Sequence, residues 1–499
     1  MRRKKSSYLI FIAVFLVFFY FFGSIQDFEL EDQENNYEDN FDPIEDEIFV
    51  KNYLELMQKN RAPARPVIEK EQKIIENRWC FLAAPKIMKN PRENWLKVAG
   101  IEIFSAYYDD RPNSLFPDNS AIQVLVMSNH TIESKIDIYC NIFVKNSRFQ
   151  KYTVVQGYIR EIWQRGWDPR GNFQVPSLIS CPIPEKLDFF KNSESDVEYS
   201  VSLTRSNCKS QKIAMKVVGK SRKIGEKKKD VAICLKGLDY QEDISGRLLE
   251  WLELQYILGA DTIGVYMYFL TQKTQNVLKY YEKLGKLTLD QISLSGSDPN
   301  SNLERSQFLK NNRPQKRRHE LIPYNDCFYR HIHTHNYVLI LDIDEVVVPI
   351  GNFSSYSEML RSVEKRLSGR SISSLSARNV FKFQTNFEVG KEWSYMRRNR
   401  KRSKNISKMG EFGKSFSSTK SVATVFNHFA LHKLSYSSSK SVYLSPNSEA
   451  IKLHYKSECP QESRNECQDL QFNLVDDTSL DRFEKQLEKR VELIRKLIL

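Results

Sequence analysis

The chain has 499 residues, of which 41% are hydrophobic and 12% aromatic. This length and composition exclude a disordered chain and allow two domains, each with its own core. The formal net charge is +13, although residues 27 to 47 carry eleven Asp or Glu and no Lys or Arg. The remaining, basic part of the chain indicates an anionic ligand or surface, or else solvated lysine-rich loops without a target.

The N-terminus has the pattern of a membrane anchor. Four basic residues precede a charge-free apolar span, and an acidic stretch follows it. A helix needs about 20 residues to cross a bilayer, and the basic flank stays cytosolic. We expect a cytosolic tail at 1–7, an uncleaved transmembrane signal anchor at 8–25 and a stem at 26–77. A cleaved signal peptide is the alternative, but large aromatic residues stand where small ones would be needed.

Cysteine content agrees with a lumenal location for the rest of the chain. Eight cysteines are an even number, which permits up to four disulfides in an oxidising compartment, and the sequence does not choose their pairing. Cys234 and Cys327 lie in apolar runs and fit buried free thiols equally well. Asn129, Asn352 and Asn405 begin Asn-x-Ser/Thr sequons, at which a lumenal protein can be glycosylated.

The segment from residue 78 to 225 is built of short alternating runs. AIQVLVMSNH and KYTVVQGYI alternate apolar and polar residues, and Asn, Ser, Gly and Pro separate such runs. Alternation with a period of two, with turn residues in between, predicts antiparallel strands. We therefore expect a β-rich N-terminal lumenal domain over 78–225.

The pattern changes after residue 226. VAICLKGL (231–238) is typical of a buried strand, and ISGRLLEWLELQYILG (244–259) has apolar residues at helical spacing. A second strand and a second helix follow, which predicts a parallel α/β sheet. We place this domain at 226–460. An amphipathic C-terminal helical segment at 461–499 either packs on the domain or makes a homodimer contact.

Three carboxylates follow the strand YVLIL: Asp342, Asp344 and Glu345. In an open α/β sheet, ligands bind beyond the carboxyl ends of the strands. Hard oxygen ligands at that point suit Mn²⁺ or Mg²⁺, which binds through one or two carboxylates and takes its other ligands from phosphates. Asp342-x-Asp344 therefore predicts a divalent metal beside a diphosphate. A strand that simply ends in a polar loop gives the same pattern by chance.

Two enzyme classes carry this local pattern. ILDIDEV fits haloacid-dehalogenase-type phosphatases, with Asp342 as nucleophile and Asp344 as general acid. It also fits nucleotide-sugar-dependent glycosyltransferases of the GT-A type, in which strand–helix units come before the Asp-x-Asp. That order is found here and favours the second class. We therefore predict an α/β fold, with a GT-A-type (Rossmann-like) catalytic domain, a preceding β-rich domain and an N-terminal transmembrane helix.

Several segments, taken together in order, resemble glycosyltransferase family 92, formerly domain of unknown function 23. They are IFSAYYDDR (103–111), SCPIP (180–184), LLEWLELQYILGADTIGVYMY (248–268), VLKYYEKLG (277–285), YNDCFYRHIHTHNYVLILDIDEVVVP (324–349) and LHY before Lys456. The resemblance implies a single-pass type II enzyme of the Golgi membrane, with its catalytic part in the lumen. It also implies Mn²⁺ (or Mg²⁺) and an inverting transfer of a sugar, galactose in the studied members, from a UDP-sugar to a glycan or glycoprotein.

Roles follow for the residues around the motif. Asp344 is expected to bind the metal, and Asp342 to contact it through water or to hold the ribose of the donor. His428 or His454 completes the metal ligands in this interpretation, since neutral imidazole binds such ions, although both fit structural histidines as well. Lys456 is a candidate for a phosphate contact as a point charge.

Other candidates rest on weaker patterns. Asn325 and Asp326, on the helix before the strand, either contact the nucleotide or cap that helix. Inverting transfer needs a carboxylate that takes the acceptor proton. Glu388 and Glu392 are the candidates for this base because they lie in the aromatic segment FQTNFEVGKEW, and surface glutamates are the alternative.

Two basic segments and one further function complete the predictions. Lys316, Arg317 and Arg318 are interpreted as a solvated loop with some attraction for phosphate. The segment MRRNRKRSK (396–404) has the composition of a nucleic-acid site, but a lumenal position excludes that partner and leaves a mobile basic loop or an inert surface. The alternative to an enzyme is a membrane-anchored glycan-binding protein with an inactive transferase domain.

Overall fold

The computed structural model describes the chain from Glu76 onward, with gaps. The described residues are 76–77, 83–88, 91–98, 100–112, 115–128, 137–164, 168, 170–191, 197–219, 226–367, 372–383, 394–407, 412–434, 440–457 and 467–498. The predicted tail at 1–7 and anchor at 8–25 lie outside these residues, as does the predicted stem at 26–77 apart from its last two residues. Among the described helices, none combines the length and the apolar character that crossing a bilayer requires.

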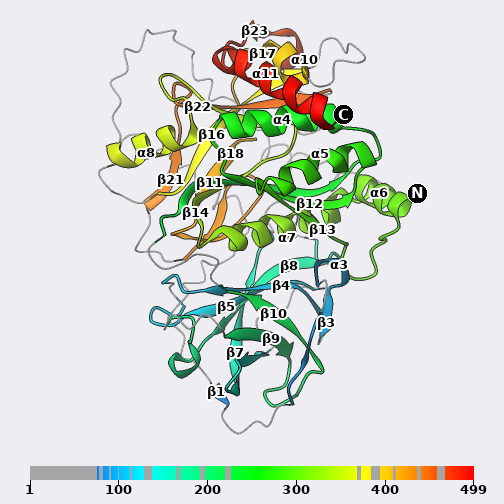
Figure 1. Cartoon of the computed structure of the whole chain (residues 1–499), viewed down its shortest axis with the longest axis vertical. Coiled ribbons are helices and arrows are strands. Elements are labelled where there is room, and N and C mark those ends of the chain that lie inside the picture. Colours follow the sequence, from blue (N-terminus) through cyan, green and yellow to red (C-terminus); the bar gives the residue numbers. More distant parts are fainter. Residues whose placement is uncertain are drawn as a thin grey trace, which may run out of the picture. The chain divides into compact units, whose positions relative to one another are not determined.

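Seven strands between residues 101 and 218 form a sheet that closes on itself (Figure 1). Their order is β4, β5, β8, β7, β6, β9, β10, and β10 pairs in parallel with β4 to complete the ring. Side chains at alternate positions fill the interior with valine, isoleucine and leucine. The strands are β4 (Ile101–Asp109), β5 (Ala121–Ser128), β6 (Ile138–Lys145), β7 (Gln150–Glu161), β8 (Val175–Pro182), β9 (Glu198–Thr204) and β10 (Ile213–Val218), with β1 (Glu76–Asn77), β2 (Lys86–Ile87) and β3 (Leu96–Val98) paired at their sides.

A disulfide joins two strands of this closed sheet. Cys140 of β6 is bonded to Cys181 of β8, and both are fully buried. Gly157 of β7 lies against the bond, because a Cβ atom at that position would meet the Cys140 Sγ at 2.9 Å. A residue with a side chain is therefore excluded there unless the bond moves.

A second sheet, of nine strands, spans residues 229 to 456. β13, β12, β11 and β14 run in parallel, and β18, β16, β22 and β15 continue the sheet with mixed directions. The strands are β11 (Lys229–Asp239), β12 (Thr262–Phe269), β13 (Leu287–Gln291), β14 (His335–Ile340), β15 (Glu345–Pro349), β16 (Ile372–Phe383), β18 (Lys414–Ser418), β21 (Lys440–Leu444) and β22 (Ala450–Lys456); β19 (Val422–Val425) pairs with β20 (Ala430–Lys433), and β17 (Lys401–Ser403) with β23 (Leu474–Asp476).

Helices cover both faces of this mixed sheet. Val231 and Ile233 of β11 join the core that includes Trp251 of α4, whereas Cys234 joins the core that includes Phe328 of α7. Because successive strand residues point to opposite faces, α4 and α7 lie on opposite sides (Figure 1). The helices are α3 (Pro91–Asn94), α4 (Ser245–Ile257), α5 (Gln272–Lys283), α6 (Asn302–Asn311), α7 (Arg313–His331), α8 (Tyr356–Arg366), α9 (Tyr395–Arg398), α10 (Cys467–Phe472) and α11 (Asp481–Ile498).

The predicted α/β fold class is wrong for this chain. Strand and helix alternate from β11 to β14, and strands dominate the rest of the described residues. Among the described residues between β4 and β10, the helical content is one 3₁₀ turn, Glu185–Leu187. Antiparallel neighbours need only short turns between them, so no crossover helices are required there. The described chain is strand-rich, with a closed seven-stranded sheet and a mixed sheet.

Helix α7 connects the two sheets. Asp326 accepts hydrogen bonds from Tyr107 of β4 at 2.8 Å and from Tyr266 of β12 at 2.6 Å, and it pairs with Arg330 at 3.3 Å. Burial alone would raise the pKa of Asp326, but the charges of Arg92 and Arg330 hold it below its ordinary value. The ionised carboxylate thus ties together elements that are far apart in the sequence.

A second disulfide fixes α7 to the mixed sheet. Cys327 of α7 is bonded to Cys234 of β11, so the alternative of two free thiols is wrong. Gly264 in the neighbouring strand β12 gives the bond room, since a Cβ atom there would meet the Cys327 Sγ at 2.5 Å. Both cysteines are buried in an apolar core. Their neighbours in the sequence are therefore apolar, as they are for buried free thiols.

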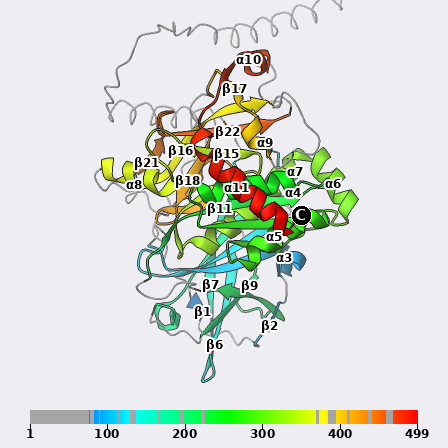
Figure 2. The ribbon, with the colours of Figure 1, turned by 45° about the horizontal axis from the view of Figure 1, so that its top comes forward.

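Both basic segments are ordered, contrary to their predicted interpretation as loops. Arg318 lies in α7, fully buried, with its guanidinium 4.1 Å from the centre of the Trp163 ring. The segment 396–404 contains most of α9 and all of β17, and Arg400 pairs with Asp481 of α11 at 2.8 Å. Helix α11 lies across α4 (Figures 1 and 2), and Leu487 is part of the core that the two helices share. Packing of the C-terminal helix on the domain was one of the two predicted alternatives.

Candidate active site

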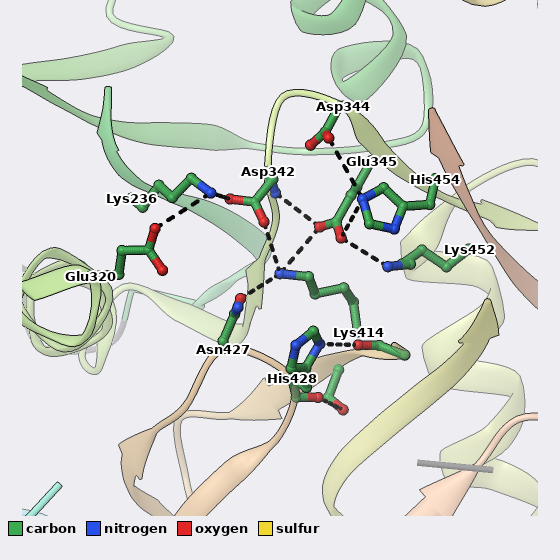
Figure 3. Close-up of polar contacts among 12 residues, drawn as sticks. Lys236, Glu320, Asp342, Asp344, Glu345, Lys414, Asn427, His428, Lys452 and His454 are labelled. Atoms are coloured by element: carbon green, nitrogen blue, oxygen red, sulfur yellow. Dashed lines mark hydrogen bonds and ion pairs between the residues drawn. The ribbon is translucent and has the colours of Figure 1, made fainter. Parts of the chain in front are cut away.

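The three carboxylates of the motif lie at the carboxyl end of β14 (Figure 3). The chain turns directly after this strand, and the Glu345 N–H donates to the Asp342 carbonyl at 3.0 Å. Leu341 and Ile343 alternate with the acids and point into the core. The Asp344 side chain is 26% exposed, whereas that of Glu345 is 2% exposed.

Asp342 is held between two lysines. Lys236 of β11 lies 2.9 Å from one carboxylate oxygen, and Lys414 of β18 lies 3.4 Å from the other. Burial alone would raise the pKa of Asp342, but the two lysines hold it well below its ordinary value. Both oxygens therefore carry an ionic partner from a neighbouring strand (Figure 3).

Glu345 is also paired with two lysines. Lys452 of β22 donates to it at 2.8 Å, and Lys414 lies 3.1 Å away. Both lysine side chains are fully buried. Burial would raise the pKa of Glu345, and the two lysine charges lower it to about 2. Removal of either lysine would leave the buried Glu345 with one ionic partner fewer.

Asp344 lies at the exposed edge of the cluster. One of its oxygens accepts a hydrogen bond from Lys456 at 2.8 Å and lies 3.5 Å from the His454 Nε2. Burial acts to raise the Asp344 pKa, but His454 and Lys456 hold it well below its ordinary value. Lys452, His454 and Lys456 alternate along β22, so their side chains share one face of that strand. The sequence pattern itself thus places three basic groups beside the acids.

Asn325 and Asp326 are not brought to these carboxylates. The Asn325 amide donates to the carbonyls of Leu321 and Val425, and its oxygen accepts from the Val425 N–H at 2.9 Å. Asp326 makes the contacts with tyrosine and arginine described above. Both side chains are fully buried. Their observed contacts attach α7 to its neighbours.

His428 lies beside Lys414 (Figure 3). Its Nδ1 lies 2.8 Å from the Gly413 carbonyl, and burial lowers the pKa of His428 to about 3. It is therefore neutral, as a metal ligand must be, but the structure does not place it with Asp344. Glu388 and Glu392 lie outside the described residues.

Of the lysines in the cluster, the sequence predicted Lys456 but not Lys236, Lys414 or Lys452. Lys236 interrupts the apolar run VAICLKGL, and a charged residue within a buried strand is a pattern that would identify it. Lys452 shares its strand face with His454, which is a second usable pattern. Lys414, in KSFSS, has no such pattern and is found only through the pairing of β18 with β14.

The residues at Asp344 fit a divalent ion only in part. Within the described ranges, no group of three or more His, Cys, Asp or Glu side chains is arranged to hold a metal. Both oxygens of Asp342 are paired with lysines, whereas the contacts of Asp344 involve one oxygen. Asp344 with His454 fits an ion that takes most of its ligands from the donor phosphates. It does not fit an ion held by protein ligands alone.

In open α/β sheets, ligands bind beyond the carboxyl ends of the parallel strands, and the carboxylate cluster lies at such an end. The family model described as glycosyltransferase family 92 matches residues 229–491. The chain belongs to this family. Family membership supports a glycosyltransferase, and the matched residues include the mixed sheet and the whole cluster described here.

Other comparisons add little. No curated protein matches the sequence. Among solved structures, the chain is similar to ferredoxin-NADP+ reductase from Plasmodium falciparum with 2'P-AMP, with 11% sequence identity, 53% of this chain and 93% of that chain covered, and a TM-score of 0.11. At this TM-score the likeness carries no argument about fold or ligand.

Proposed function

We propose that the chain is an active glycosyltransferase that moves a sugar, galactose as the first choice, from a UDP-sugar to a glycan or glycoprotein acceptor with inversion. The observation that carries the proposal is the position of Asp344 in a chain of family 92. It lies at the exposed edge of an otherwise buried cluster, beyond the carboxyl end of β14, with Lys456 and His454 beside it. Parallel-strand ends of this kind are where phosphate-bearing ligands bind.

The transfer balances as a single displacement. The acceptor hydroxyl oxygen forms a bond to the anomeric carbon, the bond from that carbon to the phosphate oxygen breaks, and UDP leaves with the electron pair. A carboxylate takes the acceptor proton, for which Glu388 and Glu392 remain the predicted candidates. Lys456, which is 32% exposed, supplies positive charge near the leaving phosphate. Asp344 and His454 would hold Mn²⁺ or Mg²⁺, which would add charge neutralisation for the departing UDP.

The proposal includes a location in the Golgi lumen. Two disulfides, one within the closed sheet and one between α7 and the mixed sheet, support an oxidising compartment, because such bonds are rare in the cytosol. A single membrane attachment and a homodimer stay predictions. Protease protection of the chain in sealed Golgi vesicles, lost after detergent is added, is the expected result.

A glycan-binding protein with an inactive transferase domain is the second candidate. One observation favours it: both Asp342 and Glu345 are neutralised by lysines, which lowers the attraction of the cluster for a dication. A haloacid-dehalogenase-type phosphatase has no such support. Its nucleophile would be Asp342, whose two oxygens are both occupied by lysine contacts.

The test is donor turnover by the full-length chain. Release of UDP from a panel of UDP-sugars is measured with an N-glycan acceptor, with Mn²⁺ and with chelator. We expect turnover with one donor, and a loss of roughly 100-fold or more in Asp344→Asn, because a charged group that acts on the leaving phosphate is removed. The exposed Arg361→Ala variant, altered in α8, is the matched control and should keep its activity.

Equal turnover in the wild type and in Asp344→Asn would contradict the proposal. Binding of the glycan without release of UDP from any donor would favour the second candidate instead. Activity that is unchanged by chelator would remove the metal from the proposal and leave the transfer in place.

A further inference from the structure

An arginine whose Nε–H has no acceptor lies close to the cluster. Arg247 belongs to α4, the helix that follows β11, and its guanidinium carbon lies 5.6 Å from the centre of the Tyr395 ring. Its Nε atom is buried and has no hydrogen-bond partner. Buried donors are nearly always paired, because an unpaired one costs about 1 to 3 kcal/mol. A guanidinium in this state is suited to a ligand that brings an acceptor.

A chain of contacts connects Arg247 to Asp344. The Tyr395 and Tyr455 rings lie 5.5 Å apart, and the Tyr455 N–H donates to the Asp344 carbonyl at 2.8 Å. The charges of Arg247 and Asp344 also act on the same side chains. Burial raises the pKa of Tyr395, Arg247 lowers it through its charge and a hydrogen bond, and the charge of Asp344 raises it further. Arg247 and Asp344 therefore both lie near the Tyr395 side chain.

Glu250 fixes this arrangement from one turn further along α4. It accepts hydrogen bonds from the Met396 N–H at 2.7 Å and from the Arg397 N–H at 3.3 Å, and the Arg397 side chain adds a third at 3.0 Å. The Tyr455 hydroxyl donates to the Met396 carbonyl at 3.4 Å. Helix α9, which carries Tyr395, is thus attached to the same helix that carries Arg247.

Charge balance distinguishes Arg247 from its neighbours. Each lysine of the cluster is paired with a carboxylate: Lys236, Lys414, Lys452 and Lys456. Among the described residues, no ion pair with Arg247 is observed. A diphosphate brings two negative charges, which favours a cation that is not already neutralised, and the fork of arginine matches phosphate oxygens in pairs.

We propose that Arg247 binds the diphosphate of the nucleotide-sugar donor, with Tyr395 beneath its guanidinium and Glu250 as a positioning residue. This inference rests on the proposed function and adds to it the residue that contacts the donor phosphates. Arg247 belongs to α4, and its guanidinium and the Tyr455 ring both lie against the Tyr395 ring. Lys456 enters from β22 itself, so the two cations reach the ligand from different elements.

Calorimetric titration of the full-length chain with UDP and with uridine, both in the presence of Mn²⁺, tests this assignment. Arg247→Ala should weaken UDP binding roughly 10- to 100-fold, the range of a charge-assisted hydrogen bond, and leave uridine binding unchanged. Arg247→Lys should restore part of the loss. Arg361→Ala, whose side chain is 70% exposed and pairs with Asp230, is the control for removal of an arginine.

The KM of Glu250→Gln for the donor distinguishes a positioning role of Glu250 from a purely structural one. We expect its KM for the donor to rise several-fold more than its kcat falls, because Tyr395 and Arg247 lose their fixed geometry. A lower melting temperature with an unchanged KM would overturn the positioning role. UDP binding that is equal in Arg247→Ala and the wild type, or an equal loss for uridine, would overturn the role of Arg247.

Failure of this inference and failure of the proposed function give different results. If the wild type binds and turns over a UDP-sugar while Arg247→Ala keeps its donor affinity, only the role of Arg247 fails. If the wild type binds no UDP, the proposed function fails and takes the inference with it.

Discussion

The closed sheet and the mixed sheet are stabilised by different interactions. The interior of the closed sheet holds valine, isoleucine and leucine side chains between its seven strands. The carboxyl end of the mixed sheet instead buries Glu345 between Lys414 and Lys452. An apolar interior loses free energy in small steps as methylene groups are removed. Buried ions stabilise a fold only together, because the removal of one charge leaves another buried charge with fewer partners.

This difference indicates where the functional site lies. Burying a charge costs free energy, and ionisable groups with shifted pKa values cluster at functional sites. The charged cluster leaves one acid, Asp344, at its exposed edge, while the closed sheet contributes support through α7. The following predictions test this contrast between the two sheets.

The largest effect is expected from Lys414→Met. The substitution leaves Glu345 and Asp342 with one lysine partner fewer each in a buried position. We expect the free energy of unfolding to fall by about 3 to 5 kcal/mol, as for other broken buried ion pairs. Urea unfolding followed by circular dichroism measures the change. Ile142→Val in the closed sheet, a fully buried residue, should cost only about 1 kcal/mol. Equal losses of unfolding free energy in the two variants would contradict the difference between the two sheets.

The two disulfides provide the next comparison. Cys140 and Cys181 are 41 residues apart in sequence, whereas Cys234 and Cys327 are 93 apart. Replacing either pair by serine should lower the free energy of unfolding by roughly 2 to 4 kcal/mol, with the larger loss for the longer loop. The difference between the pairs should stay below about 1 kcal/mol, because loop entropy grows slowly with length. A loss confined to one pair would show that strain, and not loop closure, determines the effect.

A smaller effect is expected from a buried histidine of the mixed sheet. Burial, and then the charges of Lys229 and Lys228, lower the pKa of His335 to about 4. The unfolded chain therefore binds this proton at higher pH than the folded chain, near 6.5. The contribution of His335 to the free energy of unfolding is fully present above pH 6.5. It decreases as the pH falls toward 4, and the loss is about 2 kcal/mol at pH 5. His335→Gln should show a flatter dependence of unfolding free energy on pH. Parallel curves for the two proteins would contradict the assignment.

Part of the mixed sheet was predictable from local pattern. VAICLKGL and the helix that ends before Gly259 correspond to β11 and α4, because strand alternation and helical spacing are properties of neighbouring residues. The Asp342-x-Asp344 motif was found at a strand end for the same reason. The fold class was not predictable in this way, because ring closure through β10 and β4 pairs segments about a hundred residues apart.

The sequence by itself determined which acids stand beyond β14 and that His454 and Lys456 share a strand face, since both follow from the order of residues along one strand. Only the tertiary structure decided that Lys236 and Lys414 neutralise Asp342 and that Asn325 and Asp326 make their contacts elsewhere. It also decided that the buried Nε of Arg247 has no partner among the described residues. The physical reason is that partners of a buried charge come from whichever strands and helices pack beside it. Strand register and helix packing are set by the whole core and by no local run of residues.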